Sequence, residues 1–175
     1  MFVIGEVSFR EELLEAGFVL TDDPRKVDVV VAAFDRGFDY HKLQIAFDAI
    51  RSGARFVATN RDPYCPVPGG GLPDCAAVIA AIEASTGGRV EEVVGKPSAV
   101  MAHVVLDRLG LPPDRAIMVG DRLETDIAMG VLAGMATALV LTGAARRSDL
   151  VRASVRPQFV LEDLRGLLSQ DARER

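Results

Sequence analysis

The feature that most constrains the fold is residues 120–126, GDRLETD, which lie between two apolar segments. Residues 116–119 before it are Ala-Ile-Met-Val, and residues 127–133 after it are entirely apolar or Gly. This pattern predicts a buried strand, a tight turn with carboxylates at its mouth, and a helix. Ligands in open α/β sheets bind at the carboxyl ends of strands, so Asp121 is a candidate ligand for Mg²⁺, which prefers oxygen atoms.

The same carboxylates also have a structural interpretation. Asp121 could cap the turn by accepting backbone N–H groups, and Asp126 could be an acid favoured in the first helical turn by the helix dipole. The stretch alone leaves both interpretations open, because strand–turn–helix units that carry an Asp also serve structural roles.

Composition and charge exclude several classes of protein. The 175 residues are 49% hydrophobic and carry a formal net charge of −5. A nucleic-acid surface needs concentrated basic residues, and this sequence has none, so we expect no nucleic-acid partner. The apolar runs are too short to span a bilayer, and the first residues do not resemble a secretory signal. We therefore expect a cytoplasmic protein without a membrane partner.

Predicted strands and helices alternate along the chain, which indicates an α/β fold with a parallel sheet. Strands are expected over residues 2–7, 27–34, 55–59, 90–94, 115–119, 136–141 and 159–161. Helices are expected over residues 9–16, 40–51, 75–84, 98–109, 127–133, 148–153 and 162–168. Ser8 is the expected N-cap of the first of these helices, and Asp74 is the expected N-cap of the third. Residues 60–73, with four prolines and three consecutive glycines, are expected to form an irregular loop.

The glycines at 87 and 88 predict a boundary between two domains, residues 1–88 and 89–169, followed by a polar tail over 170–175. Lys96 follows one predicted strand of the second domain, and Asp121 follows the next. Because the carboxyl ends of parallel strands meet at one edge, we expect both side chains in one crevice, suited to a phosphate and a metal. Taken alone, Lys96 would be interpreted as a solvated loop residue.

Three spaced motifs resemble the C-terminal half of a haloacid-dehalogenase (HAD) superfamily phosphatase. They are residues 94–98 (VGKPS), 118–126 (MVGDRLETD) and 142–143 (TG). Residues 3–6, 34–43 and 58–63 are similar to the large cap of its NagD, p-nitrophenyl phosphatase and pyridoxal or phosphoglycolate phosphatase branch. The resemblance implies an α/β fold with an incomplete Rossmann-like HAD core, which has a parallel sheet, and a large α/β cap domain over residues 1–88.

The resemblance also implies roles for the residues of the second domain. Lys96 would neutralise the phosphate and the catalytic carboxylates, and Asp121 would bind Mg²⁺. Asp126 would support the metal site, through water or by orienting the turn.

In the cap, the resemblance places substrate recognition in the segment that follows residue 59. Asn60, Asp62, Tyr64 and Cys65 would lie in a loop that covers and selects a small phosphorylated metabolite. The alternative for Cys65 is an idle loop thiol, because loops tolerate change.

One departure from the family pattern decides what the chain can do. Family members begin with an Asp-x-Asp-Gly motif, whose first Asp attacks phosphorus and whose second acts as acid and base, and a later strand ends in a Thr/Ser-Asn motif. No Asp-x-Asp-Gly pattern occurs anywhere in the sequence. Met1 aligns near the start of the cap, so the part of the core whose strands carry these two motifs is absent. Lys96 and Asp121 can bind and neutralise, but covalent catalysis needs a nucleophile within reach of phosphorus.

Two functions therefore compete. The first is a Mg²⁺-dependent phosphomonoester hydrolase in N-terminally incomplete form, inactive as given. The second is a non-enzymatic binding or interaction protein, or one half of a split phosphatase, in which an open sheet edge favours a homodimer or a complementary N-terminal core fragment. A receiver-like phosphoacceptor domain is a third interpretation, but the order of Lys before Asp counts against it.

Overall fold

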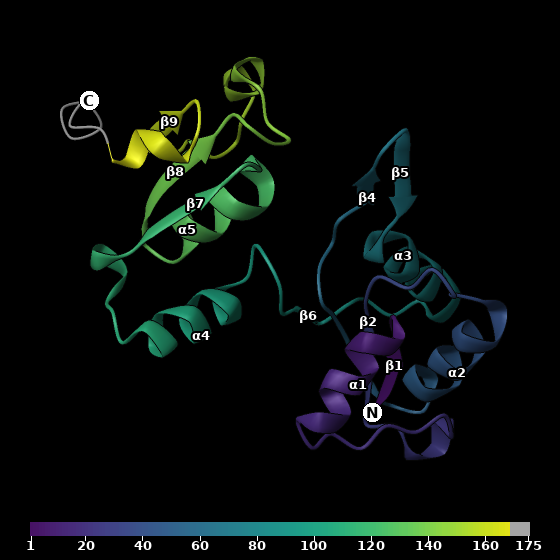
Figure 1. Cartoon of the computed structure of the whole chain (residues 1–175). Coiled ribbons are helices and arrows are strands. Elements are labelled where there is room, and N and C mark those ends of the chain that lie inside the picture. The colour runs from purple at the N-terminus through teal and green to yellow at the C-terminus, as the bar shows by residue number, and fades with distance from the viewer. Residues whose placement is uncertain (169–175) are drawn as a thin grey trace. The chain divides into compact units, whose positions relative to one another are not determined.

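The computed structural model of the chain describes residues 1–168, which form two compact units (Figure 1). The first unit is Met1–Gly95, and the second begins at Lys96. Each unit is built from parallel strands and helices, so the expected α/β class is confirmed. The tail expected over residues 170–175 lies outside the described part of the chain.

The first unit contains a parallel sheet with the strand order β1-β2-β3-β6. Its strands are β1 (Phe2–Ile4), β2 (Val29–Ala32), β3 (Arg55–Ala58) and β6 (Glu92–Val93). Val30 is central to the register, because it pairs with Phe2 on one side and Phe56 on the other. The nearly continuous apolar run of β2 is typical of a strand that is buried on both faces.

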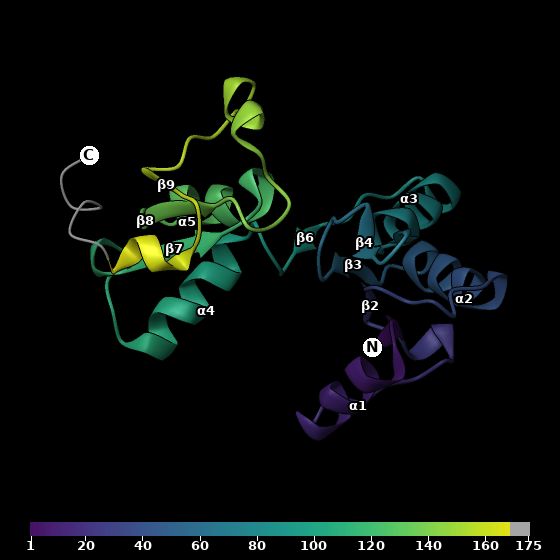
Figure 2. The ribbon, with the colours of Figure 1, turned by 45° about the horizontal axis from the view of Figure 1, so that its top comes forward.

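Two helices of the first unit pack side by side against this sheet, α2 (Tyr40–Arg51) and α3 (Cys75–Thr86) (Figure 2). Asp74 caps α3 by accepting from the Cys75 N–H at 2.6 Å, as the sequence predicts. Large side chains such as Phe56 and Ile82 are buried between the layers. Each contributes about 2 kcal/mol of burial free energy, which makes this core the main stabilising element of the unit.

Helix α1 (Val7–Glu15) differs from these two because none of its residues is buried. The prediction that Ser8 caps this helix is wrong, since the helix already begins at Val7 and Glu6 holds the N-cap position. Glu6 makes no capping hydrogen bond, because its carboxylate instead accepts three hydrogen bonds from Arg36. A short 3₁₀ turn, Pro24–Lys26, leads from this region into β2.

The stretch expected to be an irregular loop contains an antiparallel hairpin of β4 (Tyr64–Val67) and β5 (Gly70–Pro73). The prediction failed because four prolines and three glycines are unfavourable in most strands. Gly71 has a packing reason here: a Cβ at this position would lie 2.7 Å from a ring carbon of Tyr64. The glycine thus leaves room for the aromatic ring on the hairpin.

Strand β6 closes the first unit instead of opening the second. Its residue Glu92 pairs with Val57 of β3, and the Val94 N–H donates to Ala58 O at 2.9 Å. Just beyond it, a Cβ on Gly95 would lie only 2.0 Å from Thr59 O, so no side chain fits there. The division between the units therefore falls after Gly95, several residues beyond the position expected from the sequence.

The second unit has a parallel sheet with the order β7-β8-β9. Its strands are β7 (Ile117–Gly120), β8 (Ala136–Val140) and β9 (Phe159–Leu161), and its helices are α4 (Ala99–Leu109) and α5 (Ala128–Leu132). Shorter 3₁₀ turns cover Pro113–Arg115, Arg147–Val151 and Leu164–Leu167. Ser98 caps α4, and Gly110 ends it in the left-handed conformation, as expected of a C-terminal glycine.

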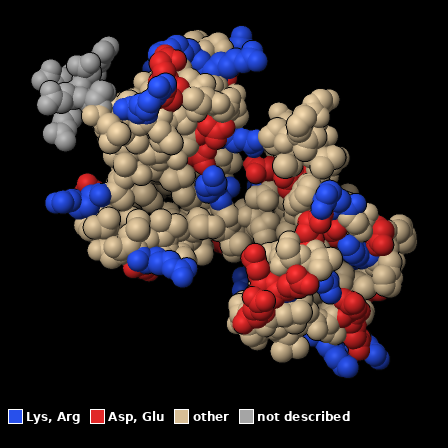
Figure 3. Space-filling view, in the orientation of Figure 1, with Lys and Arg blue, Asp and Glu red and all other residues tan. Residues whose placement is uncertain are grey.

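None of the helices within residues 1–168 combines the length and apolar character that a bilayer span requires. On the face shown in Figure 3, acidic and basic side chains are interspersed over the surface.

Candidate functional site

Asp121 lies immediately after β7, at the carboxyl end of the second sheet. Because β8 runs parallel to β7, the segment that follows β8 reaches the same edge. There the Ala144 N–H donates to Asp121 Oδ2 at 2.7 Å, and the Ala145 N–H donates to Asp121 O at 2.9 Å. A Cβ on Gly143 would lie 2.0 Å from Asp121 Oδ2. Asp121 is thus held tightly through one oxygen, while no described residue donates to Oδ1.

Asp126 is buried beneath the same turn, with a side chain only 4% exposed. Its Oδ2 accepts the N–H groups of Asp121 and Arg122, both at 3.1 Å. A π-helical turn, Leu123–Ile127, brings the carboxylate back to this position. Gly120 must be a glycine for this arrangement, since its Cβ would lie 2.2 Å from that of Asp126.

Lys96 completes the cluster. Its Nζ donates to Asp126 Oδ1 at 2.6 Å, and its side chain is 49% exposed. The expectation that Lys96 and Asp121 follow neighbouring strands of one sheet is wrong, because β6 pairs with β3 of the first unit. The direct partner of Lys96 is Asp126, which connects it to the turn that carries Asp121.

The charges of this cluster suit two kinds of ligand. The ammonium of Lys96 balances the buried carboxylate of Asp126, and two backbone N–H groups help to compensate the cost of burying that carboxylate. Asp121 adds a second negative charge and favours a cation. Lys96 forms one hydrogen bond here and has three N–H donors, so it can also donate to an anion.

These residues fit a Mg²⁺ ion as the family resemblance implies it. Proteins usually hold Mg²⁺ through one or two carboxylates, with waters and substrate phosphate completing the shell, and Asp121 offers one such oxygen. Within residues 1–168, no group of three or more His, Cys, Asp or Glu is arranged to hold a metal ion. A metal at Asp121 would therefore depend on water and substrate for most of its ligands.

The four residues predicted to select the substrate lie together in the first unit. Asn60 follows β3, and its Oδ1 accepts the Asp62 N–H at 2.8 Å, which fixes the start of the segment. Tyr64 and Cys65 lie on β4, where Tyr64 is exposed and Cys65 is half-buried. The structure therefore groups these four residues at the base of the hairpin, in a different unit from Lys96, Asp121 and Asp126.

Residues 143–145 contact Asp121 directly, but the sequence interpretation gave them no role of their own. They act through backbone N–H groups and through the absence of a side chain at Gly143. The available signal was a run of small residues, Gly-Ala-Ala, two residues after the end of a buried strand.

Comparison with known proteins identifies relatives along nearly the whole chain. Residues 93–167 match a family model described as HAD-hydrolase-like. The chain is 38% identical over 165 residues to the sugar-phosphatase AraL of Bacillus subtilis, covering 94% of this chain and 60% of that protein.

Two solved structures share the fold closely. The 4-nitrophenylphosphatase from Thermotoga maritima has a TM-score of 0.89 and 37% identity, covering 95% of this chain and 63% of that one. NagD from E. coli K-12 has a TM-score of 0.83 and 33% identity, covering 93% and 62% respectively. The chain thus spans less than two thirds of the length of these relatives.

Proposed function

Since this chain belongs to the HAD-like hydrolases, in the branch of NagD and the p-nitrophenyl phosphatases, we propose that it forms part of a Mg²⁺-dependent phosphomonoester hydrolase. The proposed substrate is a small phosphorylated metabolite in the cytoplasm, and the name of the AraL relative favours a sugar phosphate. The observation that carries the proposal is the cluster of Lys96, Asp126 and Asp121, which joins a half-exposed cation to a carboxylate with a spare oxygen.

Each residue of this cluster has a proposed role. Lys96 donates N–H groups to phosphate oxygens and neutralises their charge. Asp121 holds the metal through Oδ1, and a bound Mg²⁺ would supply further neutralisation of the phosphate. Asp126 is a positioning residue more than a metal ligand, because both of its oxygens already accept hydrogen bonds.

The first unit is proposed to act as the cap that covers the substrate. Asn60, Asp62, Tyr64 and Cys65 would then form its substrate-selecting surface. In support, the Asn60 side chain orders the segment and Tyr64 keeps half of its area exposed, as a side chain that contacts a ligand must.

The nucleophile is proposed to come from outside these 175 residues, because the sequence contains no Asp-x-Asp-Gly motif. Hydrolysis of p-nitrophenyl phosphate by this chain, with and without Mg²⁺, tests the proposal. We expect no turnover above background, since Lys96 and Asp121 cannot form the covalent intermediate. Mg²⁺-dependent hydrolysis that Asp121→Ala abolishes would show that the chain carries its own nucleophile.

A second candidate function, an interaction protein or one half of a split phosphatase, rests on a different observation. Strand β7 pairs only with β8 among the described residues, so one of its edges is open. In the same unit, α4 exposes several apolar side chains, namely Val100, Val104, Val105 and Leu109. Open strand edges and apolar surface both favour association with another chain.

The inferred occupant of this surface is a complementary core fragment that carries the missing nucleophile. Light scattering distinguishes it from a second copy of the chain. A monomer that becomes a one-to-one complex when the N-terminal third of a full-length relative is added would support a split enzyme. A homodimer that is insensitive to this fragment would support the interaction protein.

A further inference from the structure

A cavity of about 400 Å³ lies in the first unit, at the carboxyl ends of β1 and β2. Gly5 and Glu6 follow β1, and Asp35 and Gly37 follow β2, and all four line the cavity. The volume falls within the range of roughly 300–1,000 Å³ that is typical of small-molecule sites. Ligands in open α/β sheets bind at this end of the strands. Residues 60–65 are not among the lining residues, so the cavity is separate from the proposed substrate-selecting surface.

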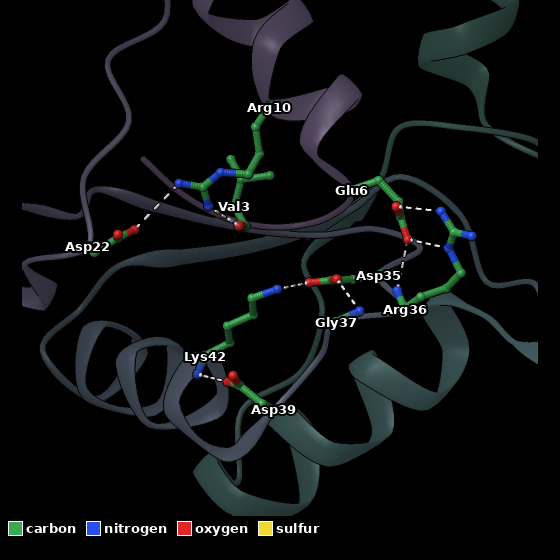
Figure 4. A network of polar contacts seen from close by, with 9 residues as sticks. All are labelled: Val3, Glu6, Arg10, Asp22, Asp35, Arg36, Gly37, Asp39 and Lys42. Atoms are coloured by element: carbon green, nitrogen blue, oxygen red, sulfur yellow. Dashed lines mark hydrogen bonds and ion pairs between the residues drawn. The ribbon is translucent and has the colours of Figure 1, made fainter.

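Lys42 is a cation of this cavity with hydrogen-bonding capacity to spare. Its Nζ donates to Asp35 Oδ2 at 2.7 Å, and its side chain is 28% exposed (Figure 4). An ammonium has three N–H donors, and no other described residue accepts one from Lys42. Asp35 is fixed in turn, because it is 4% exposed and its Oδ1 accepts the Gly37 N–H at 2.8 Å. The ammonium is therefore held in place with donors left for a ligand.

Arg10 and Asp22 line another part of the cavity. The Arg10 guanidinium comes from α1 and donates to Val3 O at 2.8 Å, which anchors it to the sheet (Figure 4). It also lies 3.6 Å from Asp22 Oδ1, and the side chain of Asp22 is 65% exposed. Asp22 thus offers carboxylate oxygens to a ligand while it remains close to a counter-charge.

Most of the charges around the cavity are paired with an opposite charge, which favours an uncharged ligand. The pairs are Lys42 with Asp35, Arg10 with Asp22, and Arg36 with Glu6, while Asp39 caps helix α2. A charged ligand would have to break one of these pairs or lie beside a like charge, and breaking the pair of Lys42 and Asp35 is costly because both side chains are largely buried. Hydroxyl groups both donate and accept, so they can bond to a lysine and a carboxylate without disturbing the pairs.

The apolar part of the lining supports the same class of ligand. Val7 lines the cavity and is 69% exposed, so it offers apolar surface, while Phe2 and Ile45 line the cavity from the core and are only 2% and 6% exposed. Binding sites for small molecules commonly combine such apolar surface with a few placed polar groups, and the carbon skeleton of a sugar or polyol can pack against it. We propose that this cavity is a second ligand site, which takes a neutral polyhydroxylated metabolite such as an unphosphorylated sugar or polyol.

Saturation-transfer NMR on the full chain tests this site, with D-ribose, D-glucose and myo-inositol as probes. We expect a saturable signal from at least one probe, weakened about tenfold in Lys42→Met and in Asp22→Asn, because each loses a hydrogen bond to a charged group. Asp22→Asn is nearly isosteric and exposed, so it keeps the test valid if Lys42→Met does not fold. The matched control is Arg25→Met, which removes an exposed ion pair with Asp23 outside the cavity.

Three results would overturn the proposal. The first is that none of the three probes binds. The second is that a probe binds both variants as tightly as it binds the wild-type chain. The third is that inorganic phosphate, and none of the neutral probes, binds in a way that depends on Lys42, since the cavity would then be an anion site.

Discussion

Two lysine–aspartate pairs, one in each unit, have nearly the same geometry. The Lys42 Nζ lies 2.7 Å from Asp35, and the Lys96 Nζ lies 2.6 Å from Asp126. Both aspartate side chains are 4% exposed, and in both the second oxygen accepts backbone N–H groups from a turn after a parallel strand. The geometry of the ion pair alone therefore does not identify a reaction site.

The surroundings of the two pairs differ, and they determine the ligand that we assign to each. Beside Lys96 lies Asp121, whose additional negative charge favours a cation and whose Oδ1 has no described donor. Around Lys42 most charges are paired with an opposite charge, and the Lys42 side chain is less exposed than that of Lys96, 28% against 49%. We thus assign a metal and a phosphate to one pair and a neutral ligand to the other.

The largest effect is expected from removing the aspartates. Asp126→Ala leaves three donors without an acceptor, which should lower the stability of the second unit by about 2–3 kcal/mol. Asp35→Ala leaves two donors without an acceptor, so we expect a smaller loss of stability, confined to the first unit. Amide hydrogen exchange measures the units separately, and a larger loss from Asp35→Ala than from Asp126→Ala would contradict the hydrogen-bond count.

Gly143→Ala should reduce the affinity for Mg²⁺ at least about tenfold, because the new Cβ displaces the carboxylate of Asp121. The matched control is Gly70→Ala, where a Cβ meets nothing within 4 Å. Calorimetric titration of Mg²⁺ into each variant measures the effect. If the wild-type chain binds Mg²⁺ and Gly143→Ala binds it equally well, residues 143–145 do not position Asp121.

Lys96→Met should strengthen Mg²⁺ binding by about threefold, since it removes a positive charge from the vicinity of the metal. The same variant should weaken the binding of inorganic phosphate. Lys42→Met should change neither affinity, because its pair lies in the other unit. If Lys96→Met and Lys42→Met change these affinities equally, the two lysine–aspartate pairs do not differ in the ligands that they bind.

The smallest effect concerns Glu6, which lies beside the Lys42 pair. Hydrogen bonds from Arg36 lower the pKa of Glu6 from its ordinary value of 4.5 to about 2. A lowered folded-state pKa stabilises the protein above pH 4.5, and this contribution is lost as the pH falls towards 2. The melting-temperature advantage of the wild-type chain over Glu6→Gln should shrink across this window, and a constant difference would refute the ion pair.

Local patterns in the sequence predict most of the elements. Helix α2 occupies Tyr40–Arg51 as its apolar periodicity predicts, and Asp74 caps α3 as expected. The hairpin was missed because its prolines and glycines favour a loop. The sequence did not predict which sheet β6 joins or which residue pairs with Lys96. Both depend on contacts between residues about thirty positions apart, which no local pattern encodes.

The central claim is that Lys96, Asp126 and Asp121 form a site for Mg²⁺ and phosphate. Titration of inorganic phosphate into the full chain, with and without Mg²⁺, tests it most directly. We predict that Mg²⁺ strengthens phosphate binding at least about tenfold in the wild-type chain and has no effect in Asp121→Asn. Phosphate binding that is absent, independent of Mg²⁺, or unchanged in Asp121→Asn would contradict the claim.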